Sequence, residues 1–337
     1  IYTTDATAGS FLGLVFSPDG RTLAGGDNYG YIRVWESFPE VQPQVVLEAP
    51  EIVFGIDFSP DGRSLAAGVR DSGVFGWDVL SGERSDSIHR PSRYLIFGLA
   101  WSPDGRFLAG GTREGDVLLW DLVSGEGPVT LEGHNEGVTR LDWSPDSSIL
   151  ASASVENSIY LWDAVTGTRS HTLEASNDVY DVAFSPDGSF LAAGLRDGTI
   201  GIWNASSWMA LRTMKGHGDS VYSVCWLPQG DLLASGSLDG TIKVWDAASG
   251  EEVRTLEGHT KNVLSVACSP DGKVIASGSE DTTIILWDAA TGERLSTLTG
   301  HTNNVHSLTW SPDGSMLASA AAGETRVLIW DAAVMLP

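Results

Sequence analysis

The chain has 337 residues, enough for two ordinary domains or for one large repetitive one. Its 44 acidic and 20 basic residues give a formal net charge of −24, which disfavours nucleic acid and anionic membrane surfaces as partners. No apolar run has the length of a membrane-spanning helix, and no signal-peptide pattern opens the chain, so we expect a cytoplasmic protein.

Two short motifs recur in step along the whole chain. Ser-Pro-Asp-Gly begins at Ser17, Ser59, Ser102, Ser185, Ser269 and Ser311, with variants at Ser144 and Leu227, at a spacing of 41 to 43 residues. A tryptophan, followed by Asp except at Glu36 and Asn204, stands at Trp35, Trp77, Trp120, Trp162, Trp203, Trp245, Trp287 and Trp330. Eight units therefore account for residues 1–337, which we interpret as one repetitive domain.

Each unit reads as four short β-strands. In unit six the runs are "VYSVCW" (221–226), "DLLASGS" (231–237), "TIKVWD" (241–246) and "EVRTLEG" (252–258). They are rich in Val, Ile and aromatic residues and are separated by Pro, Asp and Gly turns. A four-stranded sheet cannot bury both of its faces alone, so neighbouring units must stack.

These motifs resemble those of WD-repeat β-propellers, bacterial members in particular. The period ends in Trp-Asp, and Gly-His pairs stand at Gly133-His134, Gly216-His217, Gly258-His259 and Gly300-His301. The resemblance implies an all-β, eight-bladed propeller of four-stranded antiparallel blades. The first residues, "IYTTDAT", align with the end of a fourth strand, so we predict that Ile1–Thr4 complete the last blade and close the ring.

The resemblance also implies a buried relay of Trp, Ser, His and Asp within a blade. Complete sets are His217, Ser235, Asp239, Trp245 and His259, Ser277, Asp281, Trp287. Units four and eight (His134, Ser152, Trp162; His301, Ser319, Trp330) have Glu156 or Glu324 as the acid, which predicts a slacker relay. No unit that lacks the His keeps the Ser, as expected because a stranded polar group is costly when buried. We interpret the relays as structural.

The two cysteines, Cys225 and Cys268, fall one position out of register in neighbouring units. Strand alternation then directs their side chains to opposite faces. We therefore expect buried free thiols in a reducing compartment rather than a disulfide or a metal pair.

Two positions per unit reach the upper face, which by the same resemblance is where peptide partners touch WD-repeat proteins. One lies just inside the first strand, and the other precedes the acid of the turn between the second and third strands. Units two, three and five pair an aromatic residue with an arginine there, and unit six adds a tyrosine: Phe54 with Arg70, Phe97 with Arg113, Tyr180 with Arg196, and Tyr222. Aromatic and Arg side chains dominate interface hot spots, and Arg binds carboxylates. The alternative is arginines that lie over exposed rings and pair with nearby acids.

We expect a non-catalytic scaffold or sensor module that binds a protein or peptide, including an acidic one, and that belongs to a larger multidomain signalling protein. No metal and no cofactor is expected. One alternative is a propeller enzyme with its site in the axial funnel, which requires carboxylates, histidines or a metal that converge on the axis. At the upper positions only His306 and Glu280 are of this kind. A stacking or oligomerising disc is the third interpretation.

Overall fold

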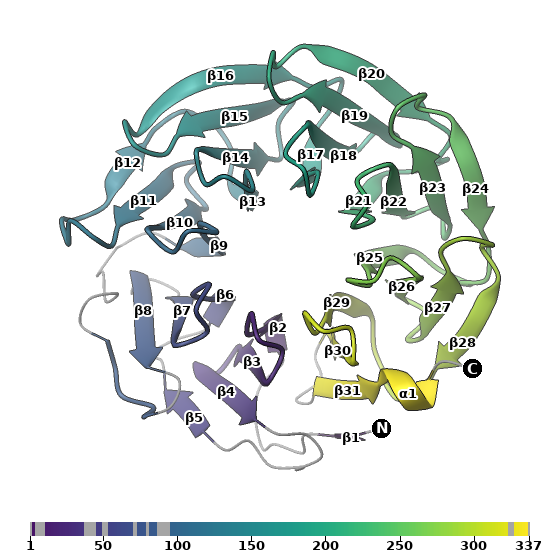
Figure 1. The fold of residues 1–337 in the computed structure, drawn as a ribbon, viewed down its shortest axis with the longest axis horizontal. Coiled ribbons are helices and arrows are strands. Elements are labelled where there is room, and N and C mark those ends of the chain that lie inside the picture. Colours follow the sequence, from purple (N-terminus) through teal and green to yellow (C-terminus); the bar gives the residue numbers. More distant parts are fainter. Residues whose placement is uncertain are drawn as a thin grey trace.

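The computed structural model describes residues 2–3, 11–36, 45–48, 53–69, 73–78, 81–85, 95–322 and 327–335. These residues form eight separate antiparallel sheets, arranged as blades around a central channel (Figure 1). The predicted all-β, eight-bladed propeller is confirmed.

Each blade begins with an inner strand beside the channel and continues outward. The inner strands of blades one to eight are β2 (Phe11–Phe16), β6 (Val53–Phe58), β9 (Ile96–Trp101), β13 (Val138–Trp143), β17 (Val179–Phe184), β21 (Val221–Trp226), β25 (Val263–Cys268) and β29 (Val305–Trp310). The second strands are β3 (Thr22–Asp27), β7 (Ser64–Val69), β10 (Phe107–Thr112), β14 (Ile149–Ser154), β18 (Phe190–Leu195), β22 (Leu232–Ser237), β26 (Val274–Ser279) and β30 (Met316–Ala321).

The third strands contain the repeated tryptophan, and the fourth strands form the outer rim. The third strands are β4 (Tyr31–Glu36), β8 (Gly73–Asp78), β11 (Val117–Asp121), β15 (Ser158–Asp163), β19 (Thr199–Asn204), β23 (Ile242–Asp246), β27 (Ile284–Asp288) and β31 (Val327–Asp331). The fourth strands are β5 (Val45–Glu48), β12 (Val129–Leu131), β16 (Thr168–Glu174), β20 (Ala210–Lys215), β24 (Glu252–Leu256), β28 (Arg294–Leu298) and β1 (Tyr2–Thr3).

Blade two differs from the others in what the structure describes of it. Its sheet has three strands, β6, β7 and β8, and an isolated bridge joins Trp77 to Arg84 just after β8. A short helix, α1 (Ala332–Met335), follows β31. Within the described ranges, no helix has the length and apolar character needed to cross a membrane.

The ring is closed by the N-terminal strand, as predicted. β1 pairs with β31, with Tyr2 opposite Ile329 and Thr3 opposite Leu328, so blade eight is built from both ends of the chain (Figure 1). Ile1 and Thr4, which the prediction included, lie outside the described residues. Blade one also packs on blade eight, because Phe11, Phe16, Leu23 and Trp35 form one buried cluster with Ala318 and Ala320.

The hydrophobic core is shared between neighbouring blades. The third-strand tryptophans are almost completely buried, and Trp35, Trp77 and Trp120 are each 1% exposed. Each lies in a cluster that spans two sheets, and Trp287 of blade seven, for example, packs with Ala234 and Val244 of blade six. Because no sheet buries both faces by itself, the blades stabilise one another.

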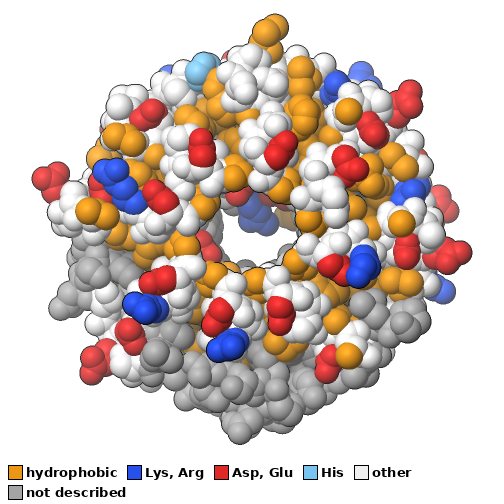
Figure 2. Space-filling model, viewed as in Figure 1, with side chains coloured by type: hydrophobic (Ala, Val, Ile, Leu, Met, Phe, Trp, Pro, Cys, Tyr) orange, Lys and Arg blue, Asp and Glu red, His pale blue; other side chains and the backbone are white. Residues whose placement is uncertain are grey.

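The Ser-Pro-Asp-Gly turns connect the inner and second strands and follow one pattern. In blade three, the Ser102 hydroxyl donates to Asp104 and accepts the backbone N–H of Phe107. Gly105 has a φ of 75°. In blade four Ser147 stands at the glycine position with a φ of 63°, and its hydroxyl accepts the backbone N–H of Asp104 (3.0 Å). The turns circle one mouth of the channel, and Figure 2 looks onto this face, where acidic side chains are spread around the opening.

The two cysteines form a disulfide, which corrects the expectation of free thiols. Cys225 of β21 and Cys268 of β25 have Cα atoms 5.9 Å apart. Their side chains do point to opposite faces of their own sheets, but in stacked blades the opposite faces of consecutive sheets are the ones that meet. Cys268 occupies the position where blade six has Trp226, whose side chain also reaches back to the preceding blade.

Candidate functional site

The predicted upper-face residues share a local backbone feature. In blade five, Val179 pairs with Leu195 and Asp181 with Gly194, so Tyr180 between them is the extra residue of a β-bulge. The same skip in pairing occurs at the matching residue of all eight inner strands: Leu12, Phe54, Phe97, Thr139, Tyr180, Tyr222, Leu264 and His306. Bulges redirect side chains at sheet edges, which explains why these positions form a surface.

The turn between the second and third strands is tied to the same end of the blade. The backbone N–H of Arg196 donates to the carbonyl of Asp178, and that of Arg113 donates to the carbonyl of Leu95 (both 2.9 Å). Asp178 directly precedes the inner strand β17, and Leu95 directly precedes the inner strand β9. The turn residues and the bulge residues therefore share the upper face, opposite the Ser-Pro-Asp-Gly turns.

Two of the predicted residues meet across a blade boundary. The rings of Tyr180 and Tyr222 have centroids 5.3 Å apart, tilted by 41°. Tyr222 is 38% exposed, an unusual value for a large apolar side chain here, and Tyr180 is partly buried beside it. The upper face thus carries a continuous aromatic pair over blades five and six.

The predicted arginines differ in their surroundings. Arg196 forms an ion pair with Asp178 (2.9 Å) although its side chain is 61% exposed, and the hydrogen bond with Asp178 raises the pKa of the guanidinium. This is the arrangement of the alternative interpretation, an arginine that pairs with a nearby acid. Arg113 is exposed, and it forms no ion pair with any described residue.

For three of the predicted residues, Arg70, Phe54 and Phe97, the described structure includes no side chain. Arg70 lies outside the described residues. Phe54 and Phe97 are described as backbone, in β6 and β9, and both occupy bulge positions. The contacts of their side chains lie outside the described part of the structure, so the pairs Phe54 with Arg70 and Phe97 with Arg113 stay predictions.

The complete relays have the expected geometry. In blade seven, Ser277 Oγ lies 2.8 Å from both His259 Nε2 and Trp287 Nε1, and His259 Nδ1 lies 2.9 Å from Asp281. Burial lowers the pKa of His259, which favours a neutral ring that donates from Nδ1 to the carboxylate. Burial alone would raise the pKa of Asp281, but hydrogen bonds from Thr283, Thr260 and His259 lower it to about 2.

Blade four corrects the expectation of a slacker relay with glutamate. His134 Nδ1 lies 2.5 Å from Glu156, and Ser152 Oγ lies 2.8 Å from His134 Nε2 and 2.9 Å from Trp162 Nε1. The longer glutamate side chain reaches the histidine without loss of contact. In blade eight Ser319 joins His301 and Trp330 at 2.8 Å each, while Glu324 lies outside the described residues.

The sequence implied that blades without the relay lose its polar groups together, but two of these blades still bury polar groups. The indole N–H groups of Trp35 and Trp120, in blades one and three, are buried and have no hydrogen-bond partner among the described residues. Blade one instead buries an ion pair between Asp27 and Arg33 (2.7 Å), with the two side chains 0% and 7% exposed. Asp197 keeps a local role and caps its own turn through Thr199, as expected.

Three aspartates on the inner strands were not singled out from the sequence. Asp57 accepts the backbone N–H of Trp101, Asp142 that of Phe184, and Asp181 that of Val224, each in the next blade. Burial raises the pKa of Asp57 and of Asp142 to about 7. They were missed because only the upper positions were considered as sources of carboxylates near the axis.

These carboxylates are used to join blades rather than to form one cluster. Asp181 has a pKa raised by burial and opposed by Arg140, whose side chain is 3.6 Å away. Basic side-chain atoms are visible inside the channel (Figure 2). Within the described ranges, no group of three or more His, Cys, Asp or Glu side chains is placed to hold a metal ion.

The repeat motifs, the eight sheets and the relays agree with comparison to known families. The sequence model described as "WD domain, G-beta repeat" matches eight segments, at residues 1–36, 41–78, 84–121, 126–163, 167–204, 208–246, 250–288 and 292–331. The chain belongs to the WD-repeat family. WD-repeat propellers generally serve as non-catalytic scaffolds that bind other proteins.

Solved structures of similar shape agree with this assignment. A computationally designed protein, Ika8, superposes on this WD-repeat chain with a TM-score of 0.83 and 25% sequence identity, over 98% of each chain. A chain in a crystal structure of the Mitotic Checkpoint Complex gives a TM-score of 0.70 at 29% identity, over 82% of this chain and 86% of that one. No curated protein matches the sequence.

Proposed function

We propose that this WD-repeat protein is a non-catalytic scaffold that binds a peptide segment of a partner protein on its upper face. One observation carries the proposal: Tyr180 and Tyr222 form an aromatic pair at bulge positions of adjacent blades, partly open to solvent. Tyrosines give a large contact area for little loss of conformational entropy, and they are frequent anchors in interfaces. The similarity to a chain of the Mitotic Checkpoint Complex supports a role in a protein assembly.

The proposed site extends toward blades three and two through the remaining predicted residues, Arg113, Phe97, Phe54 and Arg70, with Arg196 beside Tyr180. Arg113 forms no ion pair with a described residue, whereas Arg196 must exchange Asp178 for a partner carboxylate. An acidic residue of a peptide would therefore bind more readily near Arg113. The net charge of −24 opposes acidic partners at long range, so this preference is expected to be local.

The proposal is tested with peptides selected from a random display library on the wild-type protein. Their affinities are then measured for Tyr180→Ala/Tyr222→Ala and for Arg113→Glu. We expect the double alanine variant to lose about tenfold or more, as for a hot spot, and Arg113→Glu to weaken the peptides that contain acidic residues. Tyr29→Ala is the matched control, because Tyr29 is 67% exposed but lies in blade one.

Equal affinity of every selected peptide for the wild type and the double variant would show that the pair is not a binding site. The same conclusion follows if the library yields no binder to the intact protein.

The further expectations from sequence remain proposals. We propose that residues 1–337 act as one propeller unit, and that the unit serves a larger signalling protein of bacterial type. The Cys225–Cys268 disulfide weighs against a cytoplasmic location, because disulfides persist mainly in oxidising compartments. The funnel-enzyme alternative gains carboxylates in Asp57, Asp142 and Asp181, but each of them is held by a backbone N–H of the next blade.

A further inference from the structure

The disulfide between blades six and seven stands where other blade boundaries have a hydrogen bond. Cys225 and Cys268 occupy the positions that Ala183 and Trp226 have one boundary earlier, where Trp226 Nε1 donates to the carbonyl of Ala183 at 3.0 Å. Cys268 Sγ lies 3.5 Å from the carbonyl oxygen of Cys225. A thiol at Cys268 therefore has the same acceptor as the indole, but S–H is a weak donor. Without the covalent bond, this contact would hold the two inner strands only weakly.

The second bond between these inner strands is also weaker than its counterpart. Between blades five and six, the Asp181 carboxylate accepts the backbone N–H of Val224 at 2.9 Å. Between blades six and seven, Ser223 stands at the position of Asp181, and its hydroxyl accepts the backbone N–H of Val266 at 3.3 Å. A long bond to a neutral hydroxyl is weaker than a short bond to a carboxylate. The disulfide is therefore the main link between the inner ends of blades six and seven.

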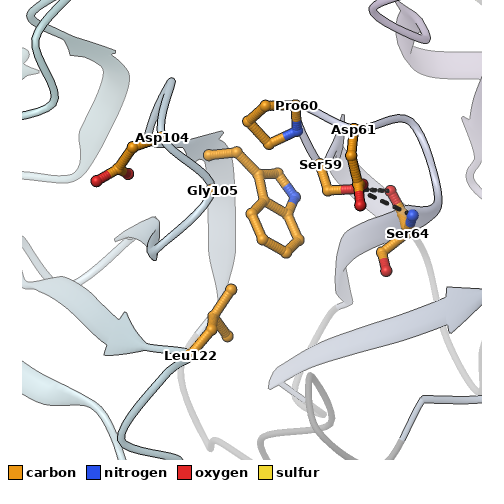
Figure 3. A pocket seen from close by; sticks show the side chains of 8 residues that line it. Ser59, Pro60, Asp61, Ser64, Asp104, Gly105 and Leu122 are labelled. Atoms are coloured by element: carbon orange, nitrogen blue, oxygen red, sulfur yellow. Dashed lines mark hydrogen bonds between the residues drawn. The ribbon is translucent and has the colours of Figure 1, made fainter.

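Neighbouring turns at this end of the ring leave space between the blades. A cavity of about 500 Å³ lies between the Ser-Pro-Asp-Gly turns of blades two and three, with Pro60 and Leu122 at opposite ends of it (Figure 3). Another cavity, of about 330 Å³, lies between blades seven and eight and is lined by Ser269 and Gly314 among other residues. The bonds between inner strands therefore matter for how closely neighbouring blades are held beside the channel.

The outer part of the boundary between blades six and seven is held independently of the cysteines. Arg254 of the outer strand β24 donates from Nη1 to the carbonyl of Ala289, in the turn after β27. Ala234 and Val244 of blade six pack with Trp287 of blade seven in one buried cluster. Loss of the disulfide therefore frees the inner end of the boundary, while the blades stay joined by their cores and rims.

The two cysteines lie at an accessible end of the channel. Both are partly exposed rather than buried. Cys268 directly precedes the turn that begins at Ser269, so the disulfide lies close to the mouth of the channel that Figure 2 faces. Access to the sulfur atoms is one of the conditions for thiol–disulfide exchange, and this disulfide meets it.

We propose that Cys225 and Cys268 form a redox-sensitive latch, which ties the inner ends of blades six and seven together when it is oxidised and lets them separate when it is reduced. The reductant is a dithiol. One of its thiolates attacks a sulfur of the latch to give a mixed disulfide, and its second thiol then closes the reductant's own disulfide and releases the latch. Cys225 and Cys268 each gain one electron and one proton. The latch does not depend on the peptide site at Tyr180 and Tyr222.

The test follows backbone amide hydrogen exchange of the intact, folded protein by NMR, with and without dithiothreitol, and detects free thiols by alkylation and mass spectrometry. The N–H of Val266 reports on the boundary between blades six and seven, and the N–H of Val224 reports on the boundary before it. Cys225→Ala/Cys268→Ala stands for the reduced state. Cys225→Ala/Cys268→Trp copies the alanine–tryptophan pair of the preceding boundary, which a reductant cannot open.

We expect dithiothreitol to release both cysteine thiols from the folded wild type, and oxidised dithiothreitol to restore the bond. Reduction should speed exchange at Val266 by about tenfold or more, because local opening of this boundary becomes easier, and should leave exchange at Val224 unchanged. The double alanine variant should exchange quickly at Val266 under both conditions. The alanine–tryptophan variant should exchange slowly there under both.

Three results would overturn the proposal. One is a disulfide that dithiothreitol reduces only after the protein has been denatured, because the bond is then a permanent cross-link. Another is unchanged exchange at Val266 in the reduced wild type. The third is equal acceleration at Val224, which would mean that reduction loosens the whole ring instead of one boundary. The measurements on the wild type decide all three points even if a variant fails to fold.

Discussion

The carboxylate of Asp57 accepts the backbone N–H of Trp101 at 2.8 Å, across the boundary between blades two and three. Asp142 and Phe184 repeat the same contact between blades four and five (2.7 Å). Where the inner strand has Ala at this position, as at Ala100, the next blade's tryptophan donates to its carbonyl instead. Five blade boundaries in the described structure are therefore joined near the channel by one of two hydrogen bonds, through an Asp carboxylate at two of them and through a tryptophan indole at three.

Replacing Asp57 by Asn should stabilise the protein at neutral and alkaline pH. Burial raises the pKa of Asp57 to about 7 from its ordinary value of 3.8. As the pH rises through this interval, the carboxyl ionises in the unfolded chain but stays protonated in the fold, so wild-type stability falls. Asn keeps an acceptor oxygen and does not ionise. Thermal unfolding should show a gain on the order of 4 kcal/mol at about pH 8 and almost none at about pH 4. A constant difference across this range would contradict the assignment.

Asp281 should have the opposite effect. Hydrogen bonds within the relay outweigh burial and lower its pKa to about 2, so its ionised form stabilises the fold above pH 3.8, and that contribution is lost as the pH falls toward 2. Asp281→Asn is expected to be less stable than the wild type by about 2 kcal/mol at neutral pH, with the gap closing in acid. Denaturant titrations at several pH values measure the gap. A gap that persists at about pH 2 would argue against the role of the charge.

The disulfide between blades six and seven should stabilise the ring. It closes a loop with a sequence separation of 43 residues, and loop entropy then gives roughly 4 kcal/mol. Dithiothreitol should lower the melting temperature of the wild type to that of Cys225→Ala/Cys268→Ala. The double variant should not respond to the reductant. An unchanged melting temperature of the reduced wild type would show that the bond adds nothing.

Two tryptophans allow the relay to be tested with the same change of side-chain volume at both sites. Trp287 donates to Ser277, whereas the N–H of Trp35 has no partner in the described part of the chain, and both rings are almost fully buried. Trp287→Phe should therefore destabilise the protein by about 2 kcal/mol more than Trp35→Phe, because only the first loses a hydrogen bond and the second removes a stranded donor. Urea unfolding compares the two. Similar losses would mean that the relay contributes little beyond packing.

The architecture could be predicted from the sequence because the same pattern of strands and turns recurs in eight units. The turns, the tryptophans and the clasp by Tyr2 and Thr3 follow from periodicity and from the need to bury thin sheets. At the upper-face positions, Tyr180 and Tyr222 are the bulge residues of their strands, with Tyr222 38% exposed and Tyr180 partly buried. Their role in binding a partner stays a prediction.

The errors arose at contacts between units, which periodicity within one unit does not describe. Strand alternation predicted correctly that the side chains of Cys225 and Cys268 point to opposite faces of their own sheets. It did not predict that these two faces meet between adjacent blades, where the disulfide forms. The reach of Glu156 and the pairing of Asp27 with Arg33 likewise depend on side-chain geometry.

The pairing of Tyr2 with Ile329 joins the two ends of the chain, so it forms only after the last blade has been made. Until then β31 presents an unpaired edge, and the first strand of a second molecule can occupy it as well as the chain's own. Concentrated refolding should therefore produce strand-exchanged dimers and longer assemblies, whereas dilute refolding should give closed monomers.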